Sequence, residues 1–366
     1  MSKKRGYPMP LDQITHSLIE LVGIHSTSGH EEHVRAYLAG RLASLGLSAQ
    51  VDTAGNLIAV LPGEGKPLML NAHMDRVPPG RGHQPLIRDG IMYSDGSTNL
   101  GADDAAGIAL VLDILTQVVT SELPHPPIIA VFTVQEEIGL HGASAFDPSP
   151  WQVSDGIVFD NAFEAGAVVS KGATYMAFDV QINGKTGHPG KNLSETVNVI
   201  DIFQDAPYPH GSLAHDQTRI LVSRIDAGNA RNAIPASAHI EGELRSYENP
   251  EARQRHQQAI QSAFEQSAQQ HGGSAIVTFD PHCTSYELDE HEPLLTLYRD
   301  VLARRGEKLR MHPTFIGSDT SAFRPRIKTF TLSTGVMNEH STEEYVALAP
   351  LEQIAQDSLQ VIRKWR

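Results

Sequence analysis

Short apolar segments alternate with helical patterns over the first part of the chain. Apolar or β-branched runs of strand length lie at residues 56–61, 67–73, 127–135 and 156–160. The stretch "AAGIALVLDILTQVVT" between the second and third run has the spacing of a helix. Strands that alternate with helices are typical of a largely parallel or mixed sheet covered on both faces. The pattern therefore predicts an α/β fold.

Local signals predict further elements of this fold. Asp89-Gly90 in "LIRDGIMY" indicates a hairpin turn. Ser28, with Glu31 three residues later, predicts a capping box at the start of a helix over 29–46. The other expected elements are helices at 10–22, 292–305 and 350–365 and strands at 49–53, 309–315 and 328–333.

The order of elements changes in the middle of the chain. The patterns there are strand, helix (190–205), two strands, helix and strand. Asn249 as cap and Pro250 at the first position mark the start of the second helix. A β-α-β-β-α-β order is that of a small ferredoxin-like layer. We therefore predict a catalytic domain in two pieces, residues 1–172 and 284–366, and an inserted ferredoxin-like lid or dimerisation domain over residues 173–283.

Length, charge and cysteine content indicate the number of domains, the kinds of partner and the cellular compartment. At 366 residues the chain is long for one core, so two domains are expected. The 43 acidic and 29 basic residues give a net charge of −14, which argues against a nucleic-acid or anionic-membrane partner. The single cysteine, Cys283, rules out an intrachain disulfide and is consistent with a reducing compartment. With no signal-peptide pattern and no membrane-spanning run, we expect a cytoplasmic protein.

Polar side chains gather where the apolar strands end. Each candidate directly follows a predicted strand or precedes a predicted helix. The ends of parallel strands converge on one crevice of an open α/β sheet, where ligands bind. The candidates are His73, Asp75, Asp103, Asp104, Glu136, Glu137, Asp160 and His340.

The charges of this group favour a metal site. Carboxylates on Asp103, Glu137 and Asp160 would meet two imidazoles, which are neutral donors. Three such acids in a poorly solvated pocket would cost many kcal/mol without counterions. Two divalent cations would neutralise them. Glu136, next to Glu137, would then remain available as a base.

Each signal alone also has a plain structural interpretation. Asp75 lies two residues from His73 on one strand face and could simply hydrogen-bond the imidazole. Asp103 and Asp104 could cap a helix. His340 could be a surface histidine, and the paired glutamates could lie on a solvated acidic surface. The combination favours a site, because every candidate falls at a strand end or a helix start.

The chain resembles the zinc exopeptidase family of peptidase T, carboxypeptidase G and aminoacylase. The resemblance covers essentially the whole chain and is strongest with the peptidase T branch, through "LGADDxAGIA" and "FTxxEEIG". The motifs that carry it, in the family's order, are "NAHMDRVP", "DGSTNLGADDAAGIA", "FTVQEEIGLHGA", "VFDN", "GKTGHPGKN", "NARNAIPASAHIEGELR", "GSDTSAF" and "MNEHSTEEYV".

This resemblance implies a role for each metal-binding candidate. One zinc ion would be bound by His73 and Asp160, and a second by Glu137 and His340. Asp103 would bridge both ions, because the family's bridging aspartate is the first residue of its D-x-K-(G/A)-G motif. Manganese or cobalt could replace zinc at imidazole and carboxylate ligands.

Catalytic and substrate-binding roles follow from the same resemblance. Glu136 would be the general base, and Asp75 would support the metal-binding imidazole of His73. His188 would help to polarise the scissile carbonyl, although it could be a turn histidine, and Arg245 could be an ordinary strand residue. Substrate contacts are implied for His188, Asn232, Arg245, Gly317 and Ser318.

Two positions depart from the family pattern. Ala105 stands where many relatives carry lysine, and Asn161 replaces a glycine common in the peptidase T branch. Neither change removes a ligand, so the departures bear on the substrate rather than on the metals.

The sequence therefore predicts a dinuclear zinc hydrolase, an aminopeptidase of the peptidase T type acting on di- and tripeptides. Two alternatives remain open: hydrolysis of N-acyl or N-carbamoyl amino acids on the same metals, and a non-catalytic metal-binding relative. A homodimer through the inserted domain is also expected.

Overall fold

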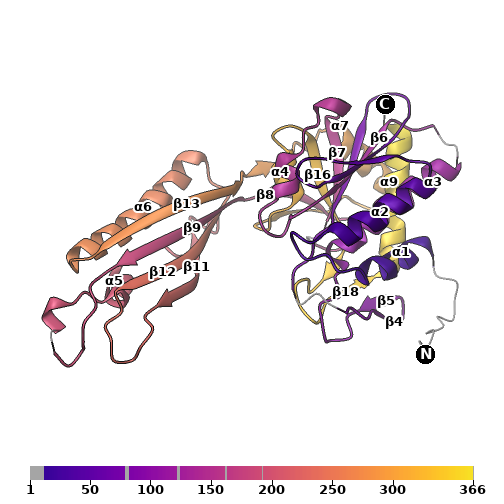
Figure 1. The fold of residues 1–366 in the computed structure, drawn as a ribbon. Coiled ribbons are helices and arrows are strands. Elements are labelled where there is room, and N and C mark those ends of the chain that lie inside the picture. Colours follow the sequence, from indigo (N-terminus) through magenta and orange to yellow (C-terminus); the bar gives the residue numbers. More distant parts are fainter. Residues whose placement is uncertain (1–11, 79–81, 122–123, 161–162, 192, 366) are drawn as a thin grey trace, which may run out of the picture. The chain divides into compact units, whose positions relative to one another are not determined.

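Two compact units make up the protein (Figure 1). The computed structural model describes residues 12–78, 82–121, 124–160, 163–191 and 193–365. Both ends of the chain build the first unit, Met1–Lys171 with Glu287–Arg366, and the segment Gly172–Tyr286 builds the second.

A mixed sheet forms the centre of the first unit. Over the described chain its strands follow the order β1-β2-β6-β3-β7-β16-β8-β14, and β15 pairs with β8. The strands are β1 (Ala49–Val51), β2 (Leu57–Leu61), β3 (Leu68–His73), β6 (Ile128–Thr133), β7 (Asp155–Asp160), β8 (Val168–Gly172), β14 (Tyr286–Glu287), β15 (Met311–Thr314) and β16 (Lys328–Ser333).

Four neighbouring strands of this sheet, β6, β3, β7 and β16, run parallel. Their register aligns His73 with Thr133 and Ser333 with Asp160. The carboxyl ends of all four strands therefore lie at the same edge of the sheet. The predicted α/β class with a largely parallel sheet is confirmed.

Helices cover this sheet. The strands β3, β6 and β7 are buried at every position, which explains their continuous apolar sequence. Of the helices, α3 packs against β3 and β7 and also contacts α1 and α9, while α8 packs against α4 and β16. Their bounds are α1 (Gln13–Val22), α2 (Glu32–Ser44), α3 (Ala102–Ser121), α4 (His141–Ala145), α7 (Pro293–Arg304), α8 (Asp319–Phe323) and α9 (Leu348–Lys364).

The helix α3 is long and apolar enough to cross a membrane by length and composition. However, 72% of its most apolar window is buried inside the structure. It is therefore explained as the core helix of the first unit.

A second, smaller sheet of the first unit joins two distant parts of the chain. It contains β4 (Leu86–Arg88), β5 (Ile91–Tyr93), β17 (Val336–Met337) and β18 (Tyr345–Ala347), in the order β17-β18-β5-β4. The hairpin prediction is confirmed, since Asp89 and Gly90 take φ values of 51° and 76° between β4 and β5. This sheet places the segment before α3 beside the segment around residue 340.

The second unit is an antiparallel sheet in the order β10-β11-β12-β9-β13, packed against α5 and α6 around a separate apolar core. The element order is the expected β-α-β-β-α-β, with the short β10 added, and Asn249 caps α6 through the N–H of Ala252 at 2.9 Å. The bounds are β9 (Thr174–Asn183), α5 (Val199–Asp205), β10 (Gly211–Leu213), β11 (Thr218–Ala227), β12 (Ser237–Ser246), α6 (Pro250–Gln270) and β13 (Ser274–Cys283).

Two local predictions were wrong. The helix expected over 190–205 begins only at Val199. The capping box was also wrong, because α2 begins at Glu32 and the hydroxyl of Ser28 donates to Asp75 at 2.7 Å. The carboxylate of Glu31 instead accepts the N–H of Gly29. A contact across 47 residues thus replaces the local cap.

Candidate metal centre

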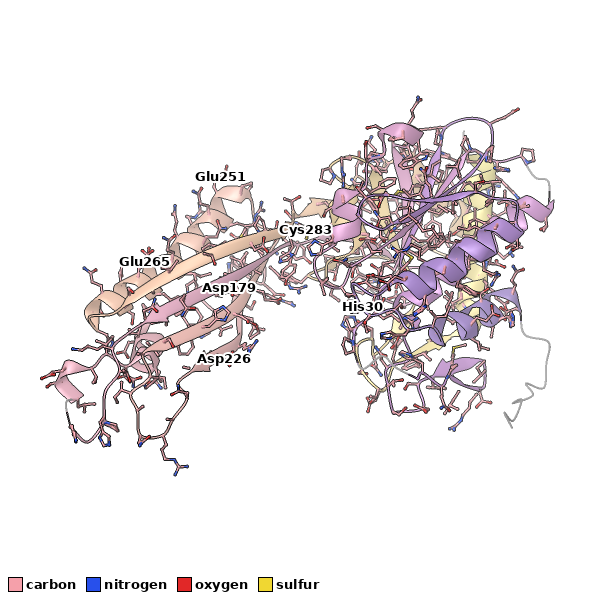
Figure 2. The ribbon with its side chains drawn as sticks, in the orientation of Figure 1. His30, Asp179, Asp226, Glu251, Glu265 and Cys283 are labelled. Atoms are coloured by element: carbon pink, nitrogen blue, oxygen red, sulfur yellow. The ribbon has the colours of Figure 1, made fainter. Side chains whose placement is uncertain are left out.

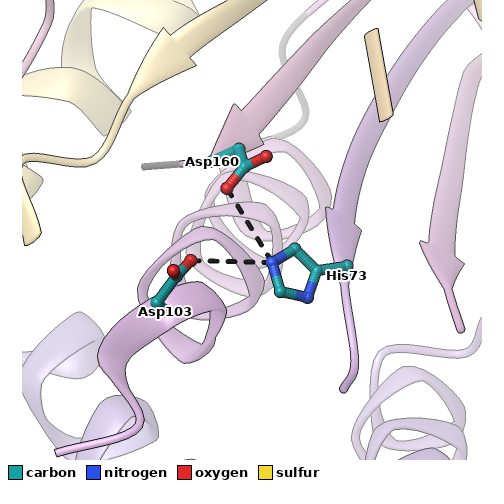
Figure 3. Close-up of side chains that lie close together, drawn as sticks. All are labelled: His73, Asp103 and Asp160. Carbon is teal, nitrogen blue, oxygen red and sulfur yellow. Dashed lines mark ion pairs between the residues drawn. The ribbon is translucent and has the colours of Figure 1, made fainter. Parts of the chain in front are cut away.

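Two strand ends and one helix start bring the first three candidates together. His73 is the last residue of β3, Asp160 is the last residue of β7, and Asp103 lies at the start of α3. His73 Nε2 is 3.6 Å from Asp103 Oδ1 and 3.8 Å from Asp160 Oδ1 (Figure 3). The three side chains could therefore hold one metal ion.

Asp103 also belongs to a second group. His340 Nε2 is 3.5 Å from Asp103 Oδ2 and 3.2 Å from Glu137 Oε1. Glu137 follows β6, whereas His340 takes a left-handed backbone conformation with φ of 62° in the segment before β18. The two oxygens of Asp103 thus face different histidines, and the two groups share this one carboxylate.

The spacing of the ligand atoms fits divalent ions. Two atoms that each lie about 2.0–2.1 Å from a tetrahedral zinc ion are about 3.3–3.4 Å apart. The four histidine–carboxylate separations run from 3.2 to 3.8 Å, and all the ligand atoms of each group lie within 4.8 Å of one another. Among the described residues, Asp103 Oδ1 is buried without a hydrogen-bond partner. A bound cation would stabilise a buried carboxylate oxygen of this kind.

The electrostatics of the cluster also demand positive charge. Asp103 and Glu137 raise the pKa of His340 to about 10. Burial alone would lower the pKa of His73, but the nearby carboxylates of Asp103 and Asp75 raise it well above the usual value. Burial would raise the pKa of Asp103, but the two histidines lower it to about 2. In the metal-free protein the imidazoles thus carry the charge, and metal binding would displace their protons.

Glu136 lies beside this cluster. Burial raises the pKa of its carboxyl well above the usual value, and the charges of Asp160 and Glu137 raise it further, against the lowering effect of His73. Within the described chain, the structure records no hydrogen bond to this carboxylate. A carboxylate with a raised pKa is a stronger base than an ordinary glutamate, as a general base requires.

Asp75 contacts both the imidazole of His73, at the end of β3, and the backbone of Glu136 and Glu137. Its buried carboxylate accepts the N–H of Glu136 at 2.9 Å, the N–H of Glu137 at 3.1 Å and the hydroxyl of Ser28 at 2.7 Å. The Nδ1–H of His73 donates to the backbone oxygen of Asp75 at 3.0 Å, so Nε2 faces the acids and is the nitrogen that could bind a metal once its proton is displaced. The sequence analysis missed the contact with the glutamate backbone.

The two aspartates at the start of α3 have different surroundings. Asp104 is buried, its Oδ2 accepts the N–H of His73 at 3.2 Å, and its Oδ1 accepts the N–H of Gly107 at 2.9 Å. Asp104 therefore caps the helix and supports β3, whereas Asp103 faces the histidines.

Asp319, at the start of α8, is a buried acid that the sequence analysis missed. The hydroxyl of Thr133 donates to its Oδ2, while Oδ1 has no partner among the described residues. Burial raises the pKa of Asp319 to about 6, against the lowering effect of the Thr133 bond. The only sequence signal is an aspartate that follows the Gly317-Ser318 pair at a helix start.

We expect Asp319→Asn to change how stability depends on pH. The folded-state pKa of about 6 lies above the ordinary value of 3.8, so the wild type loses stability as the pH rises through this interval. The asparagine does not titrate. In chelator-treated protein, the unfolding free energy of the variant relative to wild type should therefore rise by about 1–3 kcal/mol between pH 4 and pH 7, measured by urea unfolding.

Asp300→Asn on the exposed face of α7 is the matched control and should show the same pH dependence as wild type. A constant difference between Asp319→Asn and wild type at both pH values would contradict the assignment.

Of the substrate-binding candidates in the first unit, Ser318 is buried, and its hydroxyl lies 2.8 Å from that of Thr331. It therefore faces the sheet. Gly317 is partly buried and precedes it.

The remaining candidates lie in the second unit. His188 is exposed, and its Nδ1 accepts the N–H of Gly190 at 3.1 Å; Asn232 is also exposed. Arg245, on β12, pairs with Glu243 at 3.0 Å and lies 4.5 Å from the ring centroid of Tyr175. Substrate contacts remain a prediction for these side chains.

Another group of possible ligands lies on the sheet of the second unit, where Figure 2 labels Asp179 on β9. His239 Nε2 is 2.7 Å from Asp179 Oδ1, and its Nδ1 is 3.7 Å from Glu241 Oε1. The two acids thus face different ring nitrogens. Arg224 also pairs with Glu241 at 3.3 Å. Ordinary ion pairs account for this group.

A model of peptidase family M20/M25/M40 matches residues 69–364. The chain belongs to this family. The membership confirms the resemblance found in the sequence and the prediction that the chain is a peptidase. Peptidases of family M20 depend on metal, in agreement with the ligand groups around Asp103.

Similar proteins cover nearly the whole chain. A tripeptidase from Staphylococcus aureus superposes with a TM-score of 0.90 at 28% identity, covering 96% of this chain and 97% of that one. Aminopeptidase PepT from Bacillus cereus gives 0.86 at 28% identity with the same coverage. The uncharacterized protein YqjE of Bacillus subtilis is 28% identical over 365 residues, 96% of this chain and 98% of its own.

Proposed function

We propose that this M20 peptidase is a dinuclear zinc aminopeptidase that cleaves di- and tripeptides. The observation that carries the proposal is the pair of ligand groups that share the carboxylate of Asp103. The names of the two similar structures, a tripeptidase and an aminopeptidase, support the substrate class.

The metal ligands divide into two sets. His73 and Asp160 would hold one ion, Glu137 and His340 the other, and Asp103 both. When bound, two such ions polarise the carbonyl of the substrate and lower the pKa of the attacking water. Zinc suits these ligands, and manganese or cobalt are possible substitutes.

The chain's own groups would then move the proton. Glu136 would take a proton from the attacking water and deliver it to the leaving amine, a role that its burial and raised pKa support. Asp75 would keep the backbone of Glu136 and Glu137 in place through its two amide contacts. Rotation of the His73 ring would be limited by its bond to the Asp75 carbonyl.

We propose that the segment 173–283 acts as a lid or dimerisation domain inserted between the catalytic pieces 1–172 and 284–366. In this proposal a cytoplasmic homodimer forms through the inserted domain. The residues that would contact the substrate are His188, Asn232, Arg245, Gly317 and Ser318.

A hydrolysis screen tests the function. Chelated protein is reloaded with zinc, manganese or cobalt and incubated with leucine dipeptide, tripeptide and tetrapeptide, each with a free or an acetylated amino terminus, and with N-carbamoyl leucine. We expect about two ions per chain by elemental analysis and cleavage of the di- and tripeptides with a free amino terminus. Cleavage only of acetyl or carbamoyl compounds would favour the amidohydrolase alternative, and metal binding without any hydrolysis would favour a non-catalytic relative.

A further inference from the structure

Glu344 holds the chain segment that leads into Asp103. Its side chain is 1% exposed. Its Oε2 accepts the N–H groups of Leu100 at 2.8 Å and Gly101 at 2.9 Å. Its Oε1 accepts those of Ala102 at 2.8 Å and Asp103 at 3.1 Å. One carboxylate thus accepts hydrogen bonds from four consecutive backbone amides, and the last of these amides is that of Asp103 itself.

These amides need an acceptor because of where they lie. The backbone is non-helical at Asp103 and Asp104, so the amides of Leu100 to Asp103 precede the regular turns of α3 and take no part in its hydrogen-bond ladder. The backbone also has little room to move. Gly101 takes a φ of +71°, and a Cβ added there would lie 2.6 Å from Nη1 of the buried Arg76. The segment is therefore held between the carboxylate and the guanidinium.

Glu344 also belongs to the segment that carries His340. The backbone oxygen of Glu344 accepts the N–H of Ser94 at 3.0 Å, and the next residue, Tyr345, pairs with Tyr93 across β18 and β5. One short stretch thus provides the histidine of the second ligand group and binds the segment of the shared aspartate. The segment of His340 and the segment of Asp103 are therefore joined by the Glu344 contacts, close to the place where the two side chains meet.

We infer that Glu344 is a positioning residue of the metal centre, which fixes the carboxylate of Asp103 between the two ligand groups. The inference rests on the proposed dinuclear site. Because Asp103 faces both histidines, a shift of its backbone would change both ligand groups at once. Loss of a group that orients a metal ligand typically lowers metal affinity or activity by about 10–100-fold.

Three variants test the inference. Glu344→Gln leaves one acceptor oxygen, and the new amide nitrogen would face two N–H donors. Glu344→Asp keeps the charge but draws the carboxylate back from the amides. Glu343→Gln changes the exposed neighbour and is the control. Each protein is chelated and titrated with cobalt by calorimetry and by visible absorption, and its thermal midpoint and its kcat and KM for a leucine tripeptide are measured.

We expect Glu344→Gln and Glu344→Asp to bind cobalt about 10–100-fold more weakly at one or both sites, with an altered absorption spectrum. The loss should appear in kcat more than in KM, and Glu343→Gln should match wild type. If Glu344→Gln does not fold, the cobalt affinity and spectrum of Glu344→Asp test the inference. Wild-type cobalt affinity and spectrum with only a lowered thermal midpoint would mean a merely structural cap and overturn the inference.

The inference and the proposed function fail in different ways. A wild-type protein that binds two ions but cleaves no peptide refutes the function, while weakened cobalt binding in the Glu344 variants still supports the positioning role. If the wild type is active and the Glu344 variants bind cobalt as the wild type does, the positioning role is refuted and the proposed function stands.

Discussion

Replacement of Glu136 by glutamine is expected to lower kcat for a leucine tripeptide by about 10²–10⁴-fold, the usual contribution of a general acid–base. Glutamine keeps the shape of the side chain but cannot accept a proton from water. Glu136 belongs to neither of the two ligand groups that share Asp103, so the metal content and KM should stay close to those of wild type. Steady-state kinetics with elemental analysis of the same preparation measure both quantities.

Glu343→Gln serves again as the control, because it makes the same chemical change at an exposed position of the first unit. A Glu136→Gln protein with wild-type kcat would reject Glu136 as the base. Loss of metal together with activity would instead indicate that Glu136 is a ligand, which the group formed by His73, Glu136 and Glu137 makes geometrically possible.

Asp103→Asn should abolish binding of two metal ions and reduce kcat/KM at least as far as the loss of the base, by about 10²–10⁴-fold. An amide carries no charge to offset two cations, and its nitrogen is no metal ligand. In the metal-free variant, the pKa of His340, about 10 in the intact site, should fall, because Asp103 is the main cause of its elevation.

Calorimetric zinc titration counts the sites, and NMR of the imidazole nitrogens follows the pKa of His340. Asp300→Asn, on an exposed face of α7, should change neither. Two zinc sites of undiminished affinity in Asp103→Asn would contradict the shared-carboxylate arrangement.

The strand ends explain why much of the candidate site could be predicted from the sequence. His73 and Asp160 each end a buried apolar run, and such runs are readable without a structure. The parallel register then brings these ends to one edge of the sheet. Physical reasoning from the residues alone did not separate Asp103 from Asp104, because both precede the same helix.

Contacts between distant segments explain what the sequence did not show. Ser28 has the local pattern of a helix cap, yet its partner is Asp75. Glu343 and Glu344 are the same residue type side by side, and only the fold exposes one and buries the other against amides more than 240 residues earlier. No periodicity or capping rule contains such information.

The position of β16 between β7 and β8 has a consequence for biosynthesis. All the strand pairs of the five-stranded sheet lie within residues 174–283, so that sheet has left the ribosome before residue 328 is added. Until then β7 lacks one of its neighbours, and His340 and Glu344 have not been translated. A polypeptide that has not reached residue 340 therefore lacks one proposed metal ligand, and one that has not reached residue 344 lacks the carboxylate that binds the segment of Asp103.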